Sequence, residues 1–125
     1  METIVALSTP WGRSAIGVVR LSGADVLRVV QQVLPKGPQW RPRRASVRVA
    51  IDQNGEVIDD VLAVWMPGPN SYTGEDVVEL SGHGNPVLLS ALMDALIAAG
   101  ARPARPGEFT RRALENDRTN VLHAE

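Results

Sequence analysis

Short apolar runs, separated by connections rich in Gly and Pro, mark the strands that we expect in this chain. There are five such runs, at residues 3–8, 16–21, 45–51, 56–66 and 76–80. The turn Asp-Gln-Asn-Gly at residues 52–55 separates the third run from the fourth. Because an Asn-Gly pair tolerates the positive φ of tight turns, these two runs are predicted to form an antiparallel hairpin.

Three other segments have helical periodicity, at residues 26–34, 87–99 and 108–115. For the first helix we expect Ser22 to act as the cap, with Asp25 three positions later. For the second, Asn85 is the expected cap and Pro86 occupies the first helical position. The second helix is apolar almost all round, so we expect it to be buried on more than one side.

Strands and helices are mixed without a repeated strand–helix–strand unit, which favours an α+β fold. We expect one domain, with a mixed, largely antiparallel sheet on which about three helices pack. Residues 102–106 are expected to be extended because residues before Pro avoid the helical region. Residues 119–125 resemble the start of a further helix, so we place the domain at residues 1–118 and a truncated helical segment at 119–125.

Composition and charge limit the class of protein and the compartment that we expect. The chain has 125 residues, no cysteine and a net charge of −1, which favours a protein of the reducing cytoplasm over a disulfide-stapled one. No segment has the roughly 20 apolar residues that cross a bilayer, so no membrane partner is expected. The charges are segregated: a basic run extends from Lys36 to Arg48, whereas residues 49–101 hold eight acids and no Lys or Arg. The run is either a solvated face or a contact for RNA phosphates.

Several kinds of chemistry lack the residues that they need. There is no phosphate-binding loop of the P-loop type, and the only lysine, Lys36, lies between Pro35 and Gly37, so these residues are not a GTPase by themselves. The two histidines, His83 and His123, have no metal-ligand spacing, and no nucleophile elbow is present. We therefore expect neither a metal site nor a catalytic residue in this chain.

Three long motifs remain, TPWGRSAIGVVRLSG, PGPNSYTGEDVVELSGHGNP and ARPGEFTRRALEND. Their order and content resemble the N-terminal domain of the MnmE family of tRNA modification GTPases, also called TrmE. The resemblance extends from about residue 3 to the C-terminus. It implies a fold similar to the folate-binding domain of the glycine-cleavage aminomethyltransferase, an analogy of fold alone.

The resemblance also implies a function. In that family this domain binds a reduced folate, 5-formyltetrahydrofolate or 5,10-methylenetetrahydrofolate, and makes the homodimer. With the FAD- and NADH-dependent partner MnmG, the complete protein adds an aminomethyl or carboxymethylaminomethyl group to C5 of the tRNA wobble uridine. GTP, magnesium and potassium belong to a G domain that these residues lack. The chain is then a binding module of an enzyme; RNA docking, dimerisation without folate, and a free-standing aminomethyltransferase are the alternatives.

Three residues match folate-contacting positions of the family: Arg20, Glu79 and Arg118. A carboxylate at Glu79 suits the adjacent donors of a pterin edge, although a strand Glu is otherwise often solvent-facing. The Arg20 guanidinium suits an oxygen or the glutamate tail, or else forms a surface ion pair. Arg118 stands where the family commonly has Lys, and the two are not interchangeable at a directed contact.

Other motif residues have structural interpretations beside the functional ones. We expect His83 to secure a turn through its ring nitrogens rather than to catalyse. Glu75 and Asp76 are expected to accept backbone hydrogen bonds in their loop. Residues 70–73 are expected to shape a pocket wall, where the Tyr72 ring either stacks on the pterin or lies in the core. Arg13 matches the Gly-Arg pair of the family's first motif, and we expect it to lie near either the ligand or the dimer contact.

Overall fold

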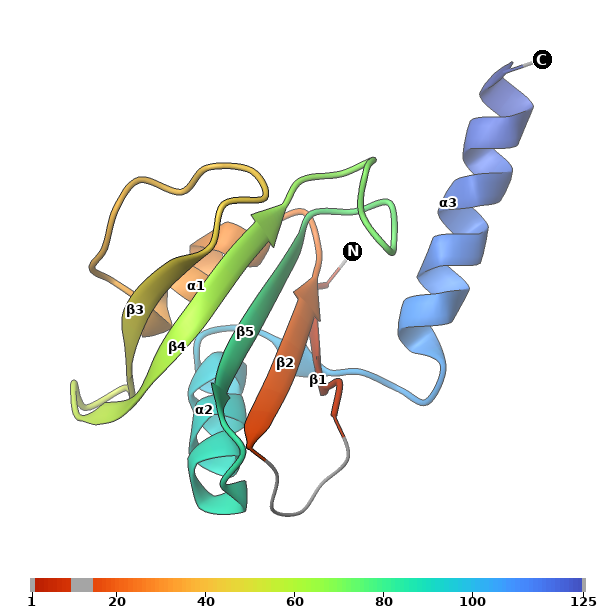
Figure 1. The fold of residues 1–125 in the computed structure, drawn as a ribbon. Helices are drawn as coiled ribbons and strands as arrows, with labels where there is room; N and C mark the ends of the chain where they lie inside the picture. The colour runs from red at the N-terminus through yellow and green to blue at the C-terminus, as the bar shows by residue number, and fades with distance from the viewer. Residues whose placement is uncertain (1, 10–14, 125) are drawn as a thin grey trace.

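The computed structural model describes residues 2–9 and 15–124, with side chains described up to residue 117. Within these residues the chain forms six strands and three helices (Figure 1). Their bounds are β1 Ile4–Leu7, β2 Ile16–Ser22, α1 Val26–Val33, β3 Ser46–Ile51, β4 Val57–Met66, β5 Val77–His83, α2 Pro86–Ala98, β6 Arg102–Pro103 and α3 Glu108–Ala124. The expected strands and helices are therefore present in the expected order.

The strands form one sheet in the order β3-β4-β5-β2-β1-β6. The β1–β6 pair is parallel and the other described pairs are antiparallel. Because the sheet is mixed and mostly antiparallel and has three helices, the predicted α+β class is confirmed. Its similarity to the glycine-cleavage domain stays a prediction.

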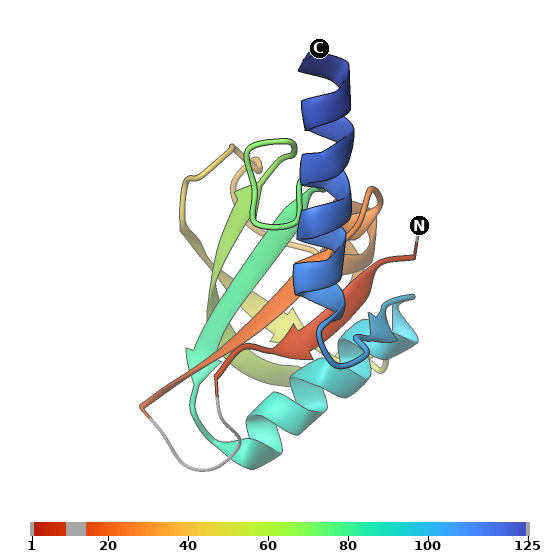
Figure 2. The ribbon, with the colours of Figure 1, turned by 90° about the vertical axis from the view of Figure 1, so that its right-hand side faces the viewer.

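Helices α1 and α2 lie on one face of the sheet, and the core fills the space between these two layers (Figures 1 and 2). Leu21 and Leu80 from the sheet and Leu96 from α2 are fully buried there. α2 buries only one side, through Leu89, Leu92, Ala95 and Leu96. The expectation of burial on several sides is wrong, since Val87 is 75% exposed although it belongs to the same apolar run.

The helix caps agree with the prediction at α2 and differ from it at α1. The Asn85 side chain accepts the N–H of Val87, and Pro86 is the first residue of α2. α1 instead begins after Asp25, which makes no side-chain cap bond. Ser22 does not cap this helix because it still belongs to β2, where its hydroxyl bonds to Thr73 and Glu75. The pairing of β2 with β5 continues through Ser22, which pairs with Val77, so the helix begins four residues later, at Val26.

The hairpin of β3 and β4 is confirmed, with a bulge between Ala50 and Ile51. Only Gly55 in its turn has a positive φ, of 83°. The turn is stabilised by Asp52, whose Oδ1 accepts the N–H groups of Asn54 and Glu56. The Asn-Gly pair therefore predicted the hairpin correctly, although Asn54 does not use the left-handed region.

α3 is one helix of 17 residues rather than a short helix followed by the start of another. It begins beside the sheet and extends away from it toward the C-terminus (Figures 1 and 2). Gly107, with a φ of 73°, precedes it and allows the sharp entry from the extended residues after β6. The domain boundary at residues 118 and 119 stays a prediction, and the backbone of α3 passes through it without a break.

Candidate ligand-binding site

Arg20 and Glu79, two of the three predicted ligand contacts, are partners. Arg20 on β2 is directly opposite Glu79 on β5, so both side chains leave the same face of the sheet. The Nε and Nη2 atoms of Arg20 both donate to Oε1 of Glu79, at 3.2 and 3.0 Å. The second carboxylate oxygen and the Nη1 group have no partner within the described residues. The pair is half-buried and offers one acceptor and one donor to a ligand.

A cavity of about 500 Å³ adjoins this pair on the side of Arg20, which lines it, whereas Glu79 is bonded to Arg20 and is not itself a lining residue. Arg20 and Tyr72 line it on one side, and residues 6–8, at the end of β1 and just after it, complete it with the segment 104–110. The Tyr72 ring centroid lies 5.4 Å from the centre of the Arg20 guanidinium. Since Tyr72 is more than half exposed, its ring belongs to the cavity wall and not to the core.

A hydrogen bond between Tyr72 and Thr110 joins the two sides of this cavity, with 2.9 Å between the hydroxyl oxygens. Tyr72 belongs to the loop after β4, and Thr110 lies in the first turn of α3. The other residues of that loop expected in a pocket wall hold the loop instead. Thr73 is fully buried against Ser22, and the Ser71 hydroxyl donates to the carbonyl of Glu75.

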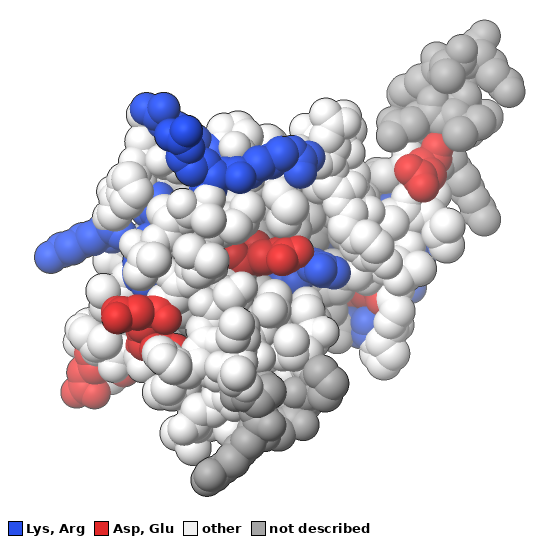
Figure 3. Space-filling view, in the orientation of Figure 1, with Lys and Arg blue, Asp and Glu red and all other residues white. Residues whose placement is uncertain are grey.

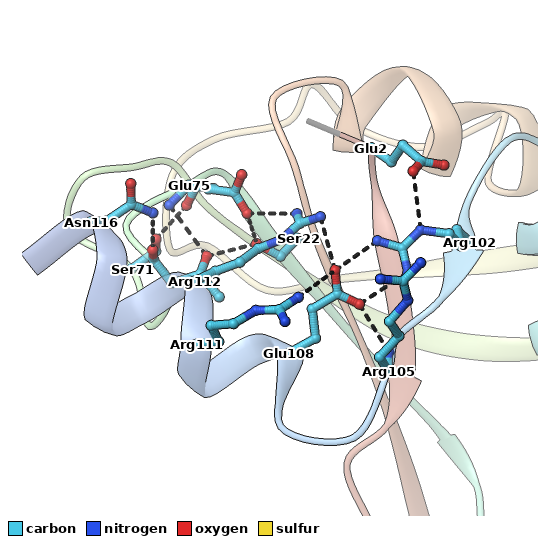
Figure 4. A network of polar contacts seen from close by, with 11 residues as sticks. Glu2, Ser22, Ser71, Glu75, Arg102, Arg105, Glu108, Arg111, Arg112 and Asn116 are labelled. Carbon is cyan, nitrogen blue, oxygen red and sulfur yellow. Dashed lines mark hydrogen bonds and ion pairs between the residues drawn. The ribbon is translucent and has the colours of Figure 1, made fainter.

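A chain of buried charges fixes α3 against the sheet (Figure 4). Arg112 donates to Glu75 at 2.9 Å and to Glu108 at 3.4 Å. Arg102 donates to both oxygens of Glu108, at 3.0 and 2.6 Å. Glu108 also lines the cavity, so the same network holds one of its walls in place.

This network corrects one expectation and confirms another. Glu75 does not accept backbone bonds from its own loop; it takes the Ser22 hydroxyl and the Arg112 guanidinium on one oxygen. Asp76 does accept the backbone N–H of Gly68, at 2.9 Å, as expected. The spacing of Glu108 and Arg112 is typical of a helical ion pair, and that signal was present in the sequence. Their burial was not, because Glu75 and Arg112 are 37 residues apart.

The network predicts acid sensitivity. The pKa of Glu108 is lowered from 4.5 to about 2, because hydrogen bonds from Arg102 outweigh the opposite effect of burial, helped by the Arg105 N–H. In the unfolded chain this carboxyl titrates near its ordinary value, so its stabilising contribution is full above pH 4.5 and is lost as the pH falls through about 2. We expect the unfolding midpoint in urea to fall across this window. Glu108→Gln is expected to be less stable at neutral pH, and its urea midpoint is expected to depend less on pH. A pH dependence equal to that of the native chain would contradict the role assigned to Glu108.

His83 lies away from the cavity, at the end of β5. Its Nδ1 is 2.7 Å from Oδ1 of Asp59, and its backbone N–H donates to Oδ2 at 3.0 Å. Burial raises the pKa of Asp59, but the backbone and ring hydrogen bonds of His83 outweigh it and lower that pKa. The ring nitrogen therefore ties β5 to β4, which agrees with the structural interpretation of His83.

Two residues singled out from the sequence fall outside this description. Arg118 lies in α3, but its side chain is outside the described residues, so its contact with a ligand stays a prediction. Arg13 is itself outside the described residues. In the part of the chain that the structure describes, no group of three or more His, Asp or Glu residues is placed to hold a metal ion. No described helix has the length and apolar character that a membrane span requires.

The fold and the site together define an α+β domain that presents a polar pair beside a cavity of ligand size. Comparison with known proteins identifies its family. Residues 3–118 match the family model described as the GTP-binding protein TrmE N-terminus. The chain therefore belongs to this family, as its three motifs predicted.

Curated relatives agree with this assignment. The chain is 50% identical over 124 residues to the tRNA modification GTPase MnmE of Halorhodospira halophila, covering 99% of this chain and 26% of that protein. The MnmE proteins of Saccharophagus degradans and Roseiflexus sp. are 46% and 44% identical, over 99% of this chain and 27% of each relative. The chain thus spans about a quarter of the length of the relatives that it matches, and it matches the N-terminal family model.

Proposed function

We propose that this chain is the folate-binding and dimerising module of a tRNA modification GTPase. The observation that carries the proposal is the Arg20–Glu79 pair beside the 500 Å³ cavity. The volume is in the range of cavities that hold drug-sized ligands, roughly 300 to 1,000 Å³. Membership of the TrmE N-terminus family supports the same proposal.

The residues present suit a reduced folate. A pterin edge carries an N–H and an amino group as neighbouring donors, and the unpartnered oxygen of Glu79 is an acceptor for them. The Nη1 group of Arg20 is a donor for a ligand oxygen, and the exposed Tyr72 ring offers a flat surface for stacking. The bound folate would supply the one-carbon unit, whereas these side chains bind and orient it. Arg118 is the third proposed contact.

The activity of the whole protein belongs to this proposal too. With MnmG, and with GTP hydrolysed by a separate G domain, a complete protein of this family would modify C5 of the wobble uridine of tRNA. Magnesium and potassium would act in the G domain. The relatives' printed name, tRNA modification GTPase, supports this reaction class.

An isothermal titration of the chain with 5-formyltetrahydrofolate tests the ligand. Saturable binding with one ligand per chain is expected, and 5,10-methylenetetrahydrofolate in the same titration shows which form is preferred. If a folded, monodisperse sample gave no heat of binding with either folate, the result would argue against folate binding by these residues.

Dimerisation has a surface to support it. On the face of the sheet away from α1 and α2, the in-register row Val47, Leu62, Ser81 and Val18 crosses four strands without a charge. Val47 and Leu62 are exposed large apolar side chains. A two-fold interface brings the same patch of two copies together, so an uncharged patch avoids like-charge repulsion. In Figure 3 uncharged side chains surround one adjacent acidic and basic group near the centre of this face, with further acidic groups at the lower left and basic groups along the upper edge.

Sedimentation at several concentrations tests the dimer. We expect a concentration-dependent dimer that Leu62→Glu converts to monomer, because two added carboxylates would face each other across the two-fold axis. Val87→Glu is the matched control, since it places the same charge at an exposed apolar position on α2. A native chain that stays monomeric at every concentration, or a control that dissociates equally, would contradict this interface.

A further inference from the structure

The connector between α1 and β3, residues 35–45, carries exposed cations without acidic partners. Residues 26–51 contain no Asp or Glu. Lys36, Arg41 and Arg44 are exposed, and no ion pair is found for them within residues 2–9 and 15–117. Figure 3 shows Lys and Arg gathered as a ridge along the upper edge, where Figure 1 places this connector. We call these three side chains the connector ridge.

Arg48 belongs to the same basic run but has another role. It is 4% exposed, and its guanidinium lies 3.8 Å from the centroid of the Trp40 ring. It donates to the carbonyl of Pro38 at 2.5 Å and to the Ser46 hydroxyl at 2.9 Å. Gly37, with a φ of 141°, lies so close to this guanidinium that a Cβ there would be 2.7 Å from Nη1. Arg48 therefore holds the connector and is unavailable to a partner.

The other end of the connector is held by Arg43. Its N–H donates to the carbonyl of Trp65 at 2.7 Å, and its guanidinium donates to the carbonyl of Asn70. Asn70 and Tyr72 belong to the same loop, and Tyr72 lines the cavity. The ridge is thus attached to the loop that forms one wall of the candidate site.

We propose that the connector ridge binds the sugar–phosphate backbone of tRNA and so places the RNA beside the folate cavity. This goes beyond folate binding and dimerisation, and it rests on the proposed function only in its choice of tRNA among polyanions. Arg and Lys side chains in a preorganised surface bind phosphates without losing the entropy of an unstructured arm. Three phosphate contacts predict a modest affinity that falls with salt, with a slope of log K against log [salt] of about −2 to −3.

The test is a salt series of tRNA binding to the native chain and to two variants with equal net charge. Arg41→Gln/Arg44→Gln removes two cations from the ridge. Gln53→Glu/Asn54→Asp adds two acids at the exposed turn at the far end of β3. In the ridge variant the slope of log K against log [salt] is expected to be smaller in magnitude by about 2, roughly 1 for each phosphate contact that is removed. The control is expected to keep the native slope.

A folate titration of each variant separates this proposal from the previous one. The ridge variant is expected to bind folate like the native chain, because neither residue lines the cavity. Equal weakening of tRNA binding in both variants would overturn the ridge, because it would show an effect of net charge alone. Absence of tRNA binding at low salt would also overturn the ridge as a tRNA site. The same conclusion would follow if the native chain preferred anionic phospholipid vesicles to tRNA and the ridge variant lost that vesicle binding. A native chain that binds tRNA as expected but no folate would leave the ridge supported and remove the folate proposal.

Discussion

Glu79→Ala is expected to weaken binding of 5-formyltetrahydrofolate by about 10- to 100-fold while the chain stays folded. The substitution removes the acceptor for the pterin donors and also leaves Arg20 without the carboxylate that orients it. Losing one partner of a hydrogen-bonded charge pair in an interface typically costs about 2 to 5 kcal/mol. We expect a loss near the bottom of this range or just below it, about 1.4 to 2.8 kcal/mol, because both side chains are about 30% exposed and water screens them. Isothermal titration gives the affinities directly.

Two further variants sharpen this test. Glu79→Gln keeps the shape and one acceptor oxygen but loses the charge, so its affinity is expected to fall between those of the native chain and Glu79→Ala. Asp60→Asn is the control, because Asp60 is an exposed acid on the neighbouring strand β4, whereas Glu79 is bonded to the cavity-lining Arg20. If Glu79→Ala bound the folate with native affinity, Glu79 would not belong to the site. If Asp60→Asn lost as much affinity as Glu79→Ala, the effect would come from overall charge and not from a contact of Glu79.

Arg112→Met is expected to lower the free energy of unfolding by about 3 to 5 kcal/mol, the cost of removing one partner from a buried charge network. Arg112 is 3% exposed and lies between Glu75 and Glu108, which are 14% and 4% exposed. Without it the Glu75 carboxylate keeps the Ser22 hydroxyl as its partner among the described residues, and Glu108 depends mainly on Arg102. Urea unfolding followed by circular dichroism measures the change.

An exposed ion pair provides the control. Arg28 is 3.6 Å from Asp25, with about two thirds of each side chain exposed, so Arg28→Met is expected to change stability by less than about 1 kcal/mol. Arg112→Lys keeps the charge without the forked donors and is expected to fall between the two. If the urea midpoint of unfolding of Arg112→Met equals that of the native chain, the network does not hold α3 as described. If it does not fold at all, the Lys variant still distinguishes a buried network from a surface pair.

The network also shows where sequence reasoning was incomplete. The motif ARPGEFTRRALEND indicates the family but does not by itself indicate that Glu108 and Arg112 are buried. Helical spacing brings these two residues together, but only the docking of α3 buries them and adds Glu75 from a distant loop. Ser22 shows the same limit, since its position suited a helix cap and its strand pairing gave it other partners.

Arg20 and Glu79 were each chosen from the motifs, but nothing local indicated that they are partners. They are 59 residues apart, and their contact depends on the register of β2 against β5. Among the residues that the structure describes, the second oxygen of Glu79 has no hydrogen-bond partner, which is the feature that suits a ligand donor. The basic run from Lys36 to Arg48 divided in the same way, because Arg48 packs on Trp40 whereas Lys36, Arg41 and Arg44 are exposed.

The sequence by itself determined the order and type of the elements, the hairpin, the cap of α2 and the family. These features depend on short-range preferences: alternation along a strand, periodicity along a helix, and the conformations open to Asn, Gly and Pro. The tertiary structure alone decided which charges are buried, which are paired and which line the cavity. That information comes from the packing of segments far apart in the chain, where burial and register set the partners of a side chain, and neither is written in its neighbours along the sequence.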